Sequence, residues 1–239
     1  MDFSLNMDAL KERKETPEVF SDTFVQSKVS LRLGFIRKVY GILSAQLLLT
    51  TAVGGLFMYN ESAKAFVQSS PNLLYLGCFA SFGLIIALHI YKNQTPINFY
   101  LLFAFTLVEA YTVGFIVTLY DSAVVLQAFG LTMATVIALT VYTFQSKRDF
   151  SSWGAGLFSM LWILILCSFM TMFFQVEAVQ TVMAGVGALL FAGFIIFDTH
   201  MLMEKLSPEE YIIGAINLYL DILNLFLEIL KLMAKNNKN

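Results

Sequence analysis

Seven apolar runs follow a polar N-terminal stretch along the chain. They cover residues 39–59, 73–91, 97–120, 123–144, 153–174, 179–197 and 211–233, with short polar connections between them. A transmembrane helix needs about 20 mostly apolar residues. Spanning strands would need an alternating pattern, which is absent here. The pattern predicts an all-α membrane protein: a tail at 1–38, then one domain at 39–239 that forms a bundle of seven transmembrane helices.

The last run differs from the others because polar side chains recur along one face of it. These are Asn217, Asp221, Asn224 and Glu228, spaced i, i+4, i+7 and i+11. Helices that lie flat on a membrane carry Lys and Arg on their polar face, whereas this face carries acids and amides. Buried in a bundle, it would offer the oxygen ligands that hard cations such as calcium prefer.

Composition agrees with a membrane protein and excludes other classes. The 239 residues are 58% hydrophobic and 13% charged, where a soluble domain carries about 25% charged residues. With 15 basic and 17 acidic residues, the chain has no basic excess for nucleic acid. Cys78 and Cys167 both lie in apolar runs, so no disulfide framework or zinc motif is predicted.

Basic residues predict the orientation of the bundle. The tail holds seven of them, and the loops on its side of the membrane hold Lys92, Lys147, Arg148 and Lys205, against Lys64 alone in the opposite loops. Basic segments stay on the cytosolic side, so we expect a cytosolic N-terminus. The lysines after residue 230 oppose this bias if the seventh run crosses fully. That run is therefore either a full span or a re-entrant hairpin.

Three acids lie within or at the edge of apolar runs: Glu109, Asp198 and Asp221. An ionised carboxylate at the centre of a transmembrane helix costs about 2.5–3.5 kcal/mol. Such acids face a water-filled cavity, share a proton or coordinate a cation. The alternative is a protonated acid that only bonds a neighbouring helix.

The sixth run has the small residues that allow a close helix neighbour. Ala184, Ala188 and Ala192 repeat every four residues, with glycines beside them. This spacing could bring Asp198 against Asp221, and two carboxyls in one apolar site do not both ionise easily, so the pair would be sensitive to pH. Tight packing without functional consequence is the alternative.

These patterns favour a cation leak channel. Asp198 and Asp221 would form the gate and a transient calcium site, Asn217 and Asn224 would extend the path, and Glu109 would line it. A calcium/proton antiporter would use the same carboxylates, and a non-conducting scaffold that acts through partner proteins would use none. We predict no enzyme and no cofactor, because zinc catalysis needs at least three good ligands and His89 and His200 are the only histidines.

Three separated motifs carry a resemblance to a known family. They are GALLFAGFIIFDTH (187–200), LSPEEY (206–211) and LYLDILNLF (218–226), supported by RKVYGIL (37–43), YLLF (100–103) and VYTFQSK (141–147). In this order and spacing they resemble the transmembrane Bax inhibitor motif family, from about Leu31 to the end of the chain.

The resemblance implies a bundle with a central last helix, calcium leak from intracellular stores and suppression of apoptosis. It implies a Golgi membrane location, with the endoplasmic reticulum as the alternative, and Bcl-2-type or calcium-release-channel partners. The family's paired aspartates would be Asp198 and Asp221, and its acid ahead of the last span would be Glu209. Bacterial relatives have an arginine in the second span; the run 73–91 has none, and His89 is no clear substitute.

Overall fold

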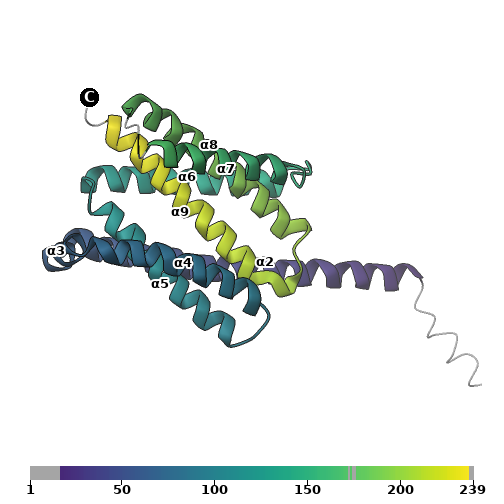
Figure 1. Ribbon diagram of the computed structural model, residues 1–239. Helices are drawn as coiled ribbons and strands as arrows, with labels where there is room; N and C mark the ends of the chain where they lie inside the picture. Colours follow the sequence, from purple (N-terminus) through teal and green to yellow (C-terminus); the bar gives the residue numbers. More distant parts are fainter. Residues whose placement is uncertain (1–16, 172, 174–175, 237–239) are drawn as a thin grey trace, which may run out of the picture.

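Long helices make up almost the whole fold (Figure 1). The computed structural model describes residues 17–171, 173 and 176–236. Its helices are α2 (Pro17–Tyr59), α3 (Glu61–Ser69), α4 (Pro71–Tyr91), α5 (Ile97–Val117), α6 (Ser122–Gln145), α7 (Trp153–Thr171), α8 (Glu177–Glu204), the 3₁₀ turn η1 (Pro208–Glu210) and α9 (Tyr211–Asn236). Seven are long and apolar enough to cross a membrane, and the described residues form no strand. The predicted all-α bundle of seven spans is confirmed.

The helices differ from the predicted runs mainly at their ends. The first helix begins at Pro17, so it joins part of the tail to the first span without a break. The helix α3 was not predicted; it follows Asn60, whose side chain accepts a hydrogen bond from the Ala63 backbone at 3.0 Å, and it buries Val67. The predicted end of the fifth run, residue 174, lies outside the described residues.

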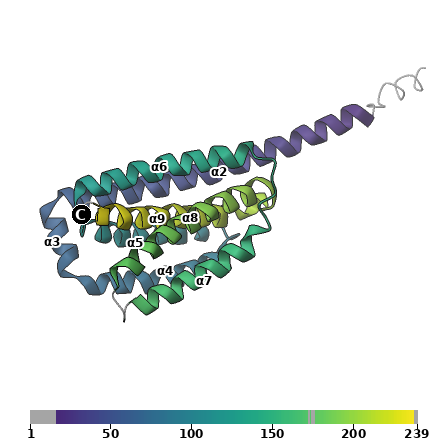
Figure 2. The same cartoon turned by 90° about the horizontal axis from the view of Figure 1, so that it is seen from above.

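The last helix lies at the centre of the bundle. In its most apolar stretch 67% of the residues are buried, against 0% in α7, and α9 packs against α8, α6 and α2 (Figure 2). It is one continuous helix, and near its end the Lys235 ammonium donates to the Glu177 carbonyl at the start of α8, at 2.8 Å. The seventh segment is therefore a full crossing and not a re-entrant hairpin.

The outward faces of the helices are apolar, as lipid requires. Phe79 is 77% exposed and Leu189 is 76% exposed, and no residue of α7 is buried. In water such a surface would be unfavourable by about 25 cal/mol for each Å² of exposed apolar area. The hydrocarbon of a bilayer removes this cost, so these faces mark the membrane-facing surface.

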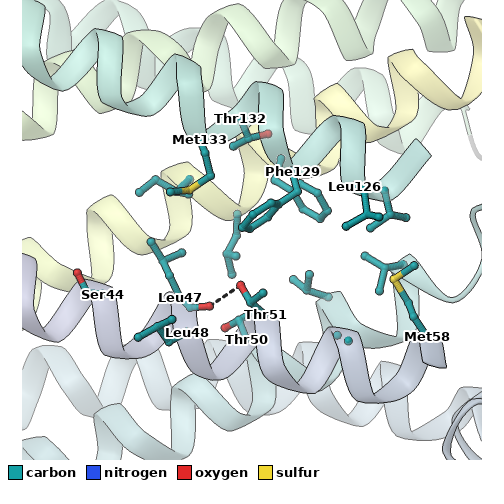
Figure 3. Close-up of a pocket in the computed structure, with 18 of the residues that line it drawn as sticks. Ser44, Leu47, Leu48, Thr50, Thr51, Met58, Leu126, Phe129, Thr132 and Met133 are labelled. Carbon is teal, nitrogen blue, oxygen red and sulfur yellow. Dashed lines mark hydrogen bonds between the residues drawn. The ribbon is translucent and has the colours of Figure 1, made fainter. Parts of the chain in front are cut away.

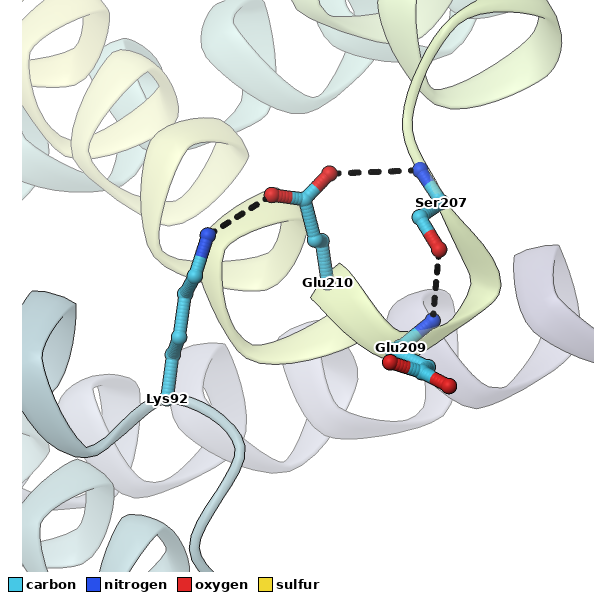
Figure 4. A network of polar contacts seen from close by, with 4 residues as sticks. All are labelled: Lys92, Ser207, Glu209 and Glu210. Carbon is cyan, nitrogen blue, oxygen red and sulfur yellow. Dashed lines mark hydrogen bonds and ion pairs between the residues drawn. The ribbon is translucent and has the colours of Figure 1, made fainter.

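Lys92, Lys147, Arg148 and Lys205 lie at one end of the bundle, called here the basic end, because α4, α6 and α8 all finish there. Two contacts join other elements to the linker between α8 and α9. The Arg32 guanidinium of α2 donates to the Leu206 carbonyl at 2.6 Å. The Lys92 ammonium pairs with Glu210 at 2.7 Å, and Ser207 caps the η1 turn beside it (Figure 4). These contacts hold the start of α9 in place.

Candidate ion pathway along the central helix

The structure brings Asp198 of α8 and Asp221 of α9 together. Their carboxyl groups are close enough to interact directly, and the two residues are only 9% and 7% exposed. The pair lies in the half of the bundle nearer the basic end, because Asp198 is close to the end of α8 and Asp221 is in the first half of α9.

Small residues of α8 allow this meeting. Ala184 is 3% exposed. A methyl group at Gly187 would lie 3.0 Å from both Cγ and Cδ of Glu228 on α9. Since carbon atoms prefer separations of about 3.5–4.0 Å, a methyl group here would require the Glu228 side chain to shift, and glycine leaves room for it. Of the small residues in this run, Gly187 packs closely against α9, whereas a Cβ atom at Gly193 would meet Leu157 of α7 and one at Gly185 would meet nothing within 4 Å.

No cation neutralises the aspartate pair within the part of the chain that the structure describes. Asn217 donates a long hydrogen bond of 3.5 Å to Asp198 Oδ1, while Asp221 Oδ2 is buried and has no hydrogen-bond partner among the described residues. Buried polar atoms left in this way bind water or an ion. Two adjacent buried carboxyls are stable when they share a proton or hold a cation.

Farther along α9, the other two polar residues have separate partners. The Asn224 amide donates to the Leu220 carbonyl of its own helix at 2.8 Å. The Glu228 carboxylate pairs with Lys231 at 2.9 Å, and its side chain is 14% exposed. The polar stripe therefore continues from the aspartate pair toward the opposite end of the bundle, with oxygen-bearing side chains at each step.

Glu109 lies apart from the aspartate pair. It is on α5, and its carboxylate accepts a hydrogen bond from the Ser81 hydroxyl of α4 at 2.6 Å. The structure thus satisfies this acid by a bond between α4 and α5 and does not bring it together with Asp198 and Asp221.

Two adjacent acids, Glu209 and Glu210, precede the last span, and they differ in the contacts that they make (Figure 4). Glu209 is exposed, and only its backbone N–H makes a contact there, to Ser207 Oγ at 3.5 Å. Glu210 carries the side chain that bonds both Lys92 and the Ser207 backbone. The contact between α4 and the α8–α9 linker therefore uses Glu210.

The two histidines, His89 and His200, do not form a metal site with other side chains in the part of the chain that the structure describes. His89 is exposed, and its Nδ1 lies 2.9 Å from the Ile85 carbonyl of its own helix. His200 Nε2 lies 2.9 Å from Asp149 Oδ1. Within the described ranges no three His, Cys, Asp or Glu side chains gather around one point.

The hydrogen bonds that join helices across the core were not predicted from the sequence. The Thr50 and Tyr219 hydroxyls lie 2.7 Å apart, between α2 and α9. The Gln46 amide donates to the Thr106 hydroxyl at 3.0 Å, between α2 and α5. These residues occupy apolar runs, where Thr and Tyr do not stand out. Their positions on the inward faces of the helices are the sequence feature that could have predicted these hydrogen bonds.

An apolar pocket of about 530 Å³ lies between α2 and α6, with α9 and α5 behind it (Figure 3). Its lining includes exposed Leu48 and Leu126, so it opens toward the bilayer, and its few polar atoms are hydroxyls such as that of Thr51, which donates to the Leu47 carbonyl. Such a lining offers no carboxylate to a cation. The polar stripe of α9 is therefore the better candidate path.

Comparison with known proteins supports one family throughout the bundle. The family model described as "Inhibitor of apoptosis-promoting Bax1" matches residues 32–238. The Golgi anti-apoptotic protein of Vaccinia virus (strain Lister) and protein lifeguard 4 of Mus musculus are each 52% identical over 219 residues, which is 92% of this chain and 92% of each relative. A BI1-like protein of Arabidopsis thaliana is 44% identical over 211 residues, 87% of this chain and 82% of the relative. The chain belongs to the Bax inhibitor family of anti-apoptotic membrane proteins.

Proposed function

We propose that the protein is a calcium leak channel of an intracellular membrane, sensitive to pH through Asp198 and Asp221, and that it suppresses apoptosis by lowering stored calcium. The observation that carries the proposal is the buried aspartate pair, which lacks a neutralising cation among the described residues. Calcium is the hard divalent ion that such oxygen ligands favour.

The pair suits a gate because its charge depends on one shared proton. With the proton in place, the two carboxyls hold α8 and α9 together by a hydrogen bond. When the proton leaves to water, the two negative charges either attract a calcium ion or push the helices apart. Asn217, Asn224 and Glu228 would then offer further oxygen atoms along the same face of α9.

The Golgi membrane is the proposed location, because one relative at 52% identity is called the Golgi anti-apoptotic protein. With basic loops on the cytosolic side, the basic end and the N-terminus would face the cytosol. Bcl-2-type proteins and calcium-release channels are the partners we propose, on the family resemblance.

Calcium flux in proteoliposomes tests the proposal, with a calcium-sensitive dye inside the vesicles and a series of outside pH values. Asp198→Asn and Asp221→Asn should each reduce flux on the order of tenfold, which corresponds to about 1.4 kcal/mol of lost cation attraction, and should flatten its pH dependence. Asp121→Asn is the matched control, since Asp121 is exposed before α6 and its side chain makes no capping bond.

Each of the other possible outcomes would indicate a different function for this protein. Unchanged flux in a folded Asp221→Asn variant would refute the gate. Calcium movement against its gradient, driven by an imposed pH difference, would make the protein a calcium/proton antiporter. No flux from the wild type, together with retained suppression of cell death, would favour a non-conducting scaffold.

A further inference from the structure

A second polar pocket lies at the basic end, apart from the aspartate pair. It has a volume of about 240 Å³ and lies between the α6–α7 connection and the end of α8. Its lining consists of Ser146, Lys147, Arg148, Asp149, His200, Met203, Glu204 and Lys205. Two separate elements therefore supply charged side chains to one small space.

The cations of this pocket are not neutralised by ion pairs. Across the ranges that the structure describes, Lys147, Arg148 and Lys205 form no ion pair with a carboxylate. Two carboxylates, Asp149 and Glu204, also line the pocket. With three cations against two anions, the pocket carries a net positive charge even when His200 is neutral.

One of the two carboxylates already has other partners. Asp149 Oδ1 accepts a hydrogen bond from the Ser151 backbone at 2.8 Å and lies 2.9 Å from His200 Nε2. Hydrogen bonds from Ser151 are the main cause that lowers the pKa of Asp149 to about 2, with smaller contributions from His200 and Lys205. Asp149 therefore orders the loop through Ser151 and His200. Among the described residues Lys147 and Arg148 form no ion pair with it, so both remain available to a ligand.

The pocket lies at the depth where lipid headgroups lie. Tyr142 at the end of α6 and Trp153 at the start of α7 flank it and are 46% and 42% exposed. Exposed Trp and Tyr at the ends of spans mark the membrane–water interface. The Phe150 ring packs edge-on against both Trp153 and His200, with centroids 5.1 and 5.7 Å apart. This packing ties the pocket to the aromatic border.

We propose that this pocket binds the phosphate of an anionic phospholipid in the leaflet at the basic end. Arg148 can donate a pair of hydrogen bonds to phosphate oxygens, and Lys147 and Lys205 act as compact positive charges beside it. Basic pockets between spanning helices are suited to phosphorylated lipid headgroups. A lipid is favoured over soluble phosphate because its acyl chains can lie on the exposed apolar faces of α6 and α7.

Native mass spectrometry of the purified full-length protein in neutral detergent can test the proposal. The probe is dioctanoyl phosphatidic acid, compared with dioctanoyl phosphatidylcholine and with inorganic phosphate. The double variant Arg148→Gln, Lys205→Gln should bind phosphatidic acid on the order of 30-fold more weakly. The matched control Arg37→Gln, Lys64→Gln removes the same charge outside the pocket and should change binding by less than about twofold.

Several results would overturn the proposal. They are equal phosphatidic acid binding by variant and wild type, an equal loss in the control, and phosphatidylcholine binding as tight as that of phosphatidic acid. Inorganic phosphate that binds as tightly, with the same dependence on Arg148, would assign the site to soluble phosphate instead. If the double variant does not fold, the single Arg148→Gln in the exposed loop decides, with an expected loss on the order of fivefold; no loss in that folded variant refutes the site.

Discussion

Gly114 of α5 has no room for a methyl group where α5 packs against α2. A Cβ atom at this position would lie 2.8 Å from Cδ2 and 3.2 Å from Cε2 of Phe57, and 3.4 Å from Cγ1 of Val53. The Phe57 ring is held edge-on against Tyr111, with ring centroids 5.8 Å apart. We therefore expect Gly114→Ala to strain the contact between these two spans.

The size of the effect follows from these distances. Carbon atoms prefer separations of about 3.5–4.0 Å, so the Phe57 ring must move by about 0.7 Å or more. Overpacking of this kind costs about 1–3 kcal/mol. Gly130→Ala in α6 is the matched control, because a Cβ there meets nothing within 4 Å. Both changes gain the same helix propensity, about 1 kcal/mol, so their difference isolates the strain.

Thermal unfolding in detergent, followed by tryptophan fluorescence, measures this difference. For a chain of this length each kcal/mol shifts Tm by about 2–4 °C, so Gly114→Ala should unfold roughly 2–12 °C below Gly130→Ala. Adding Phe57→Leu to Gly114→Ala should restore much of the loss by making the contact smaller. A Tm for Gly114→Ala equal to or above that of Gly130→Ala would refute the packing argument.

Two further predictions concern a buried bond and the loop at the basic end. The Thr50 and Tyr219 hydroxyls lie 2.7 Å apart. A double-mutant cycle of Thr50→Val and Tyr219→Phe, measured by unfolding, should give a coupling free energy of about 0.6–1.7 kcal/mol. A coupling below about 0.3 kcal/mol would contradict the bond. Asp149 has a pKa of about 2, chiefly through hydrogen bonds from Ser151, below its unfolded value of about 3.9. Its carboxylate therefore stabilises the fold above about pH 4, and that stabilisation is lost as pH falls toward 2. Asp149→Asn should flatten the fall of Tm across this interval, and an unchanged slope would count against the assignment.

The sequence predicted the spans well because hydropathy is a local property. The predicted run 97–120 corresponds to α5, which ends at Val117, and the run 123–144 corresponds to α6, which ends at Gln145. Errors came where polar residues continue a helix beyond the apolar stretch. Helix α8 ends at Glu204, seven residues after the predicted end at 197, because a helix can project from the membrane with its backbone bonds intact.

The polar face of α9 and the small-residue face of α8 were also readable, since both depend on helical periodicity. These faces supported two hypotheses, a contact between Asp198 and Asp221 or tight helix packing without functional consequence. The structure has the two aspartates in contact. Glu109 has a partner in Ser81, and no pattern within either apolar run indicates that contact. Periodicity says which residues share a face but does not say which helix the face meets.

By itself the sequence determined that this is a seven-span, all-α membrane protein with costly acids in its last two spans, because length, hydropathy and spacing act along the chain. Tertiary structure alone decided that α9 crosses fully, that Glu210 is the acid that pairs with Lys92, and that Asp149 meets His200. The physical reason is that these contacts join residues 51 to 118 positions apart. They depend on how each helix is rotated and packed against its neighbours, which no local pattern specifies.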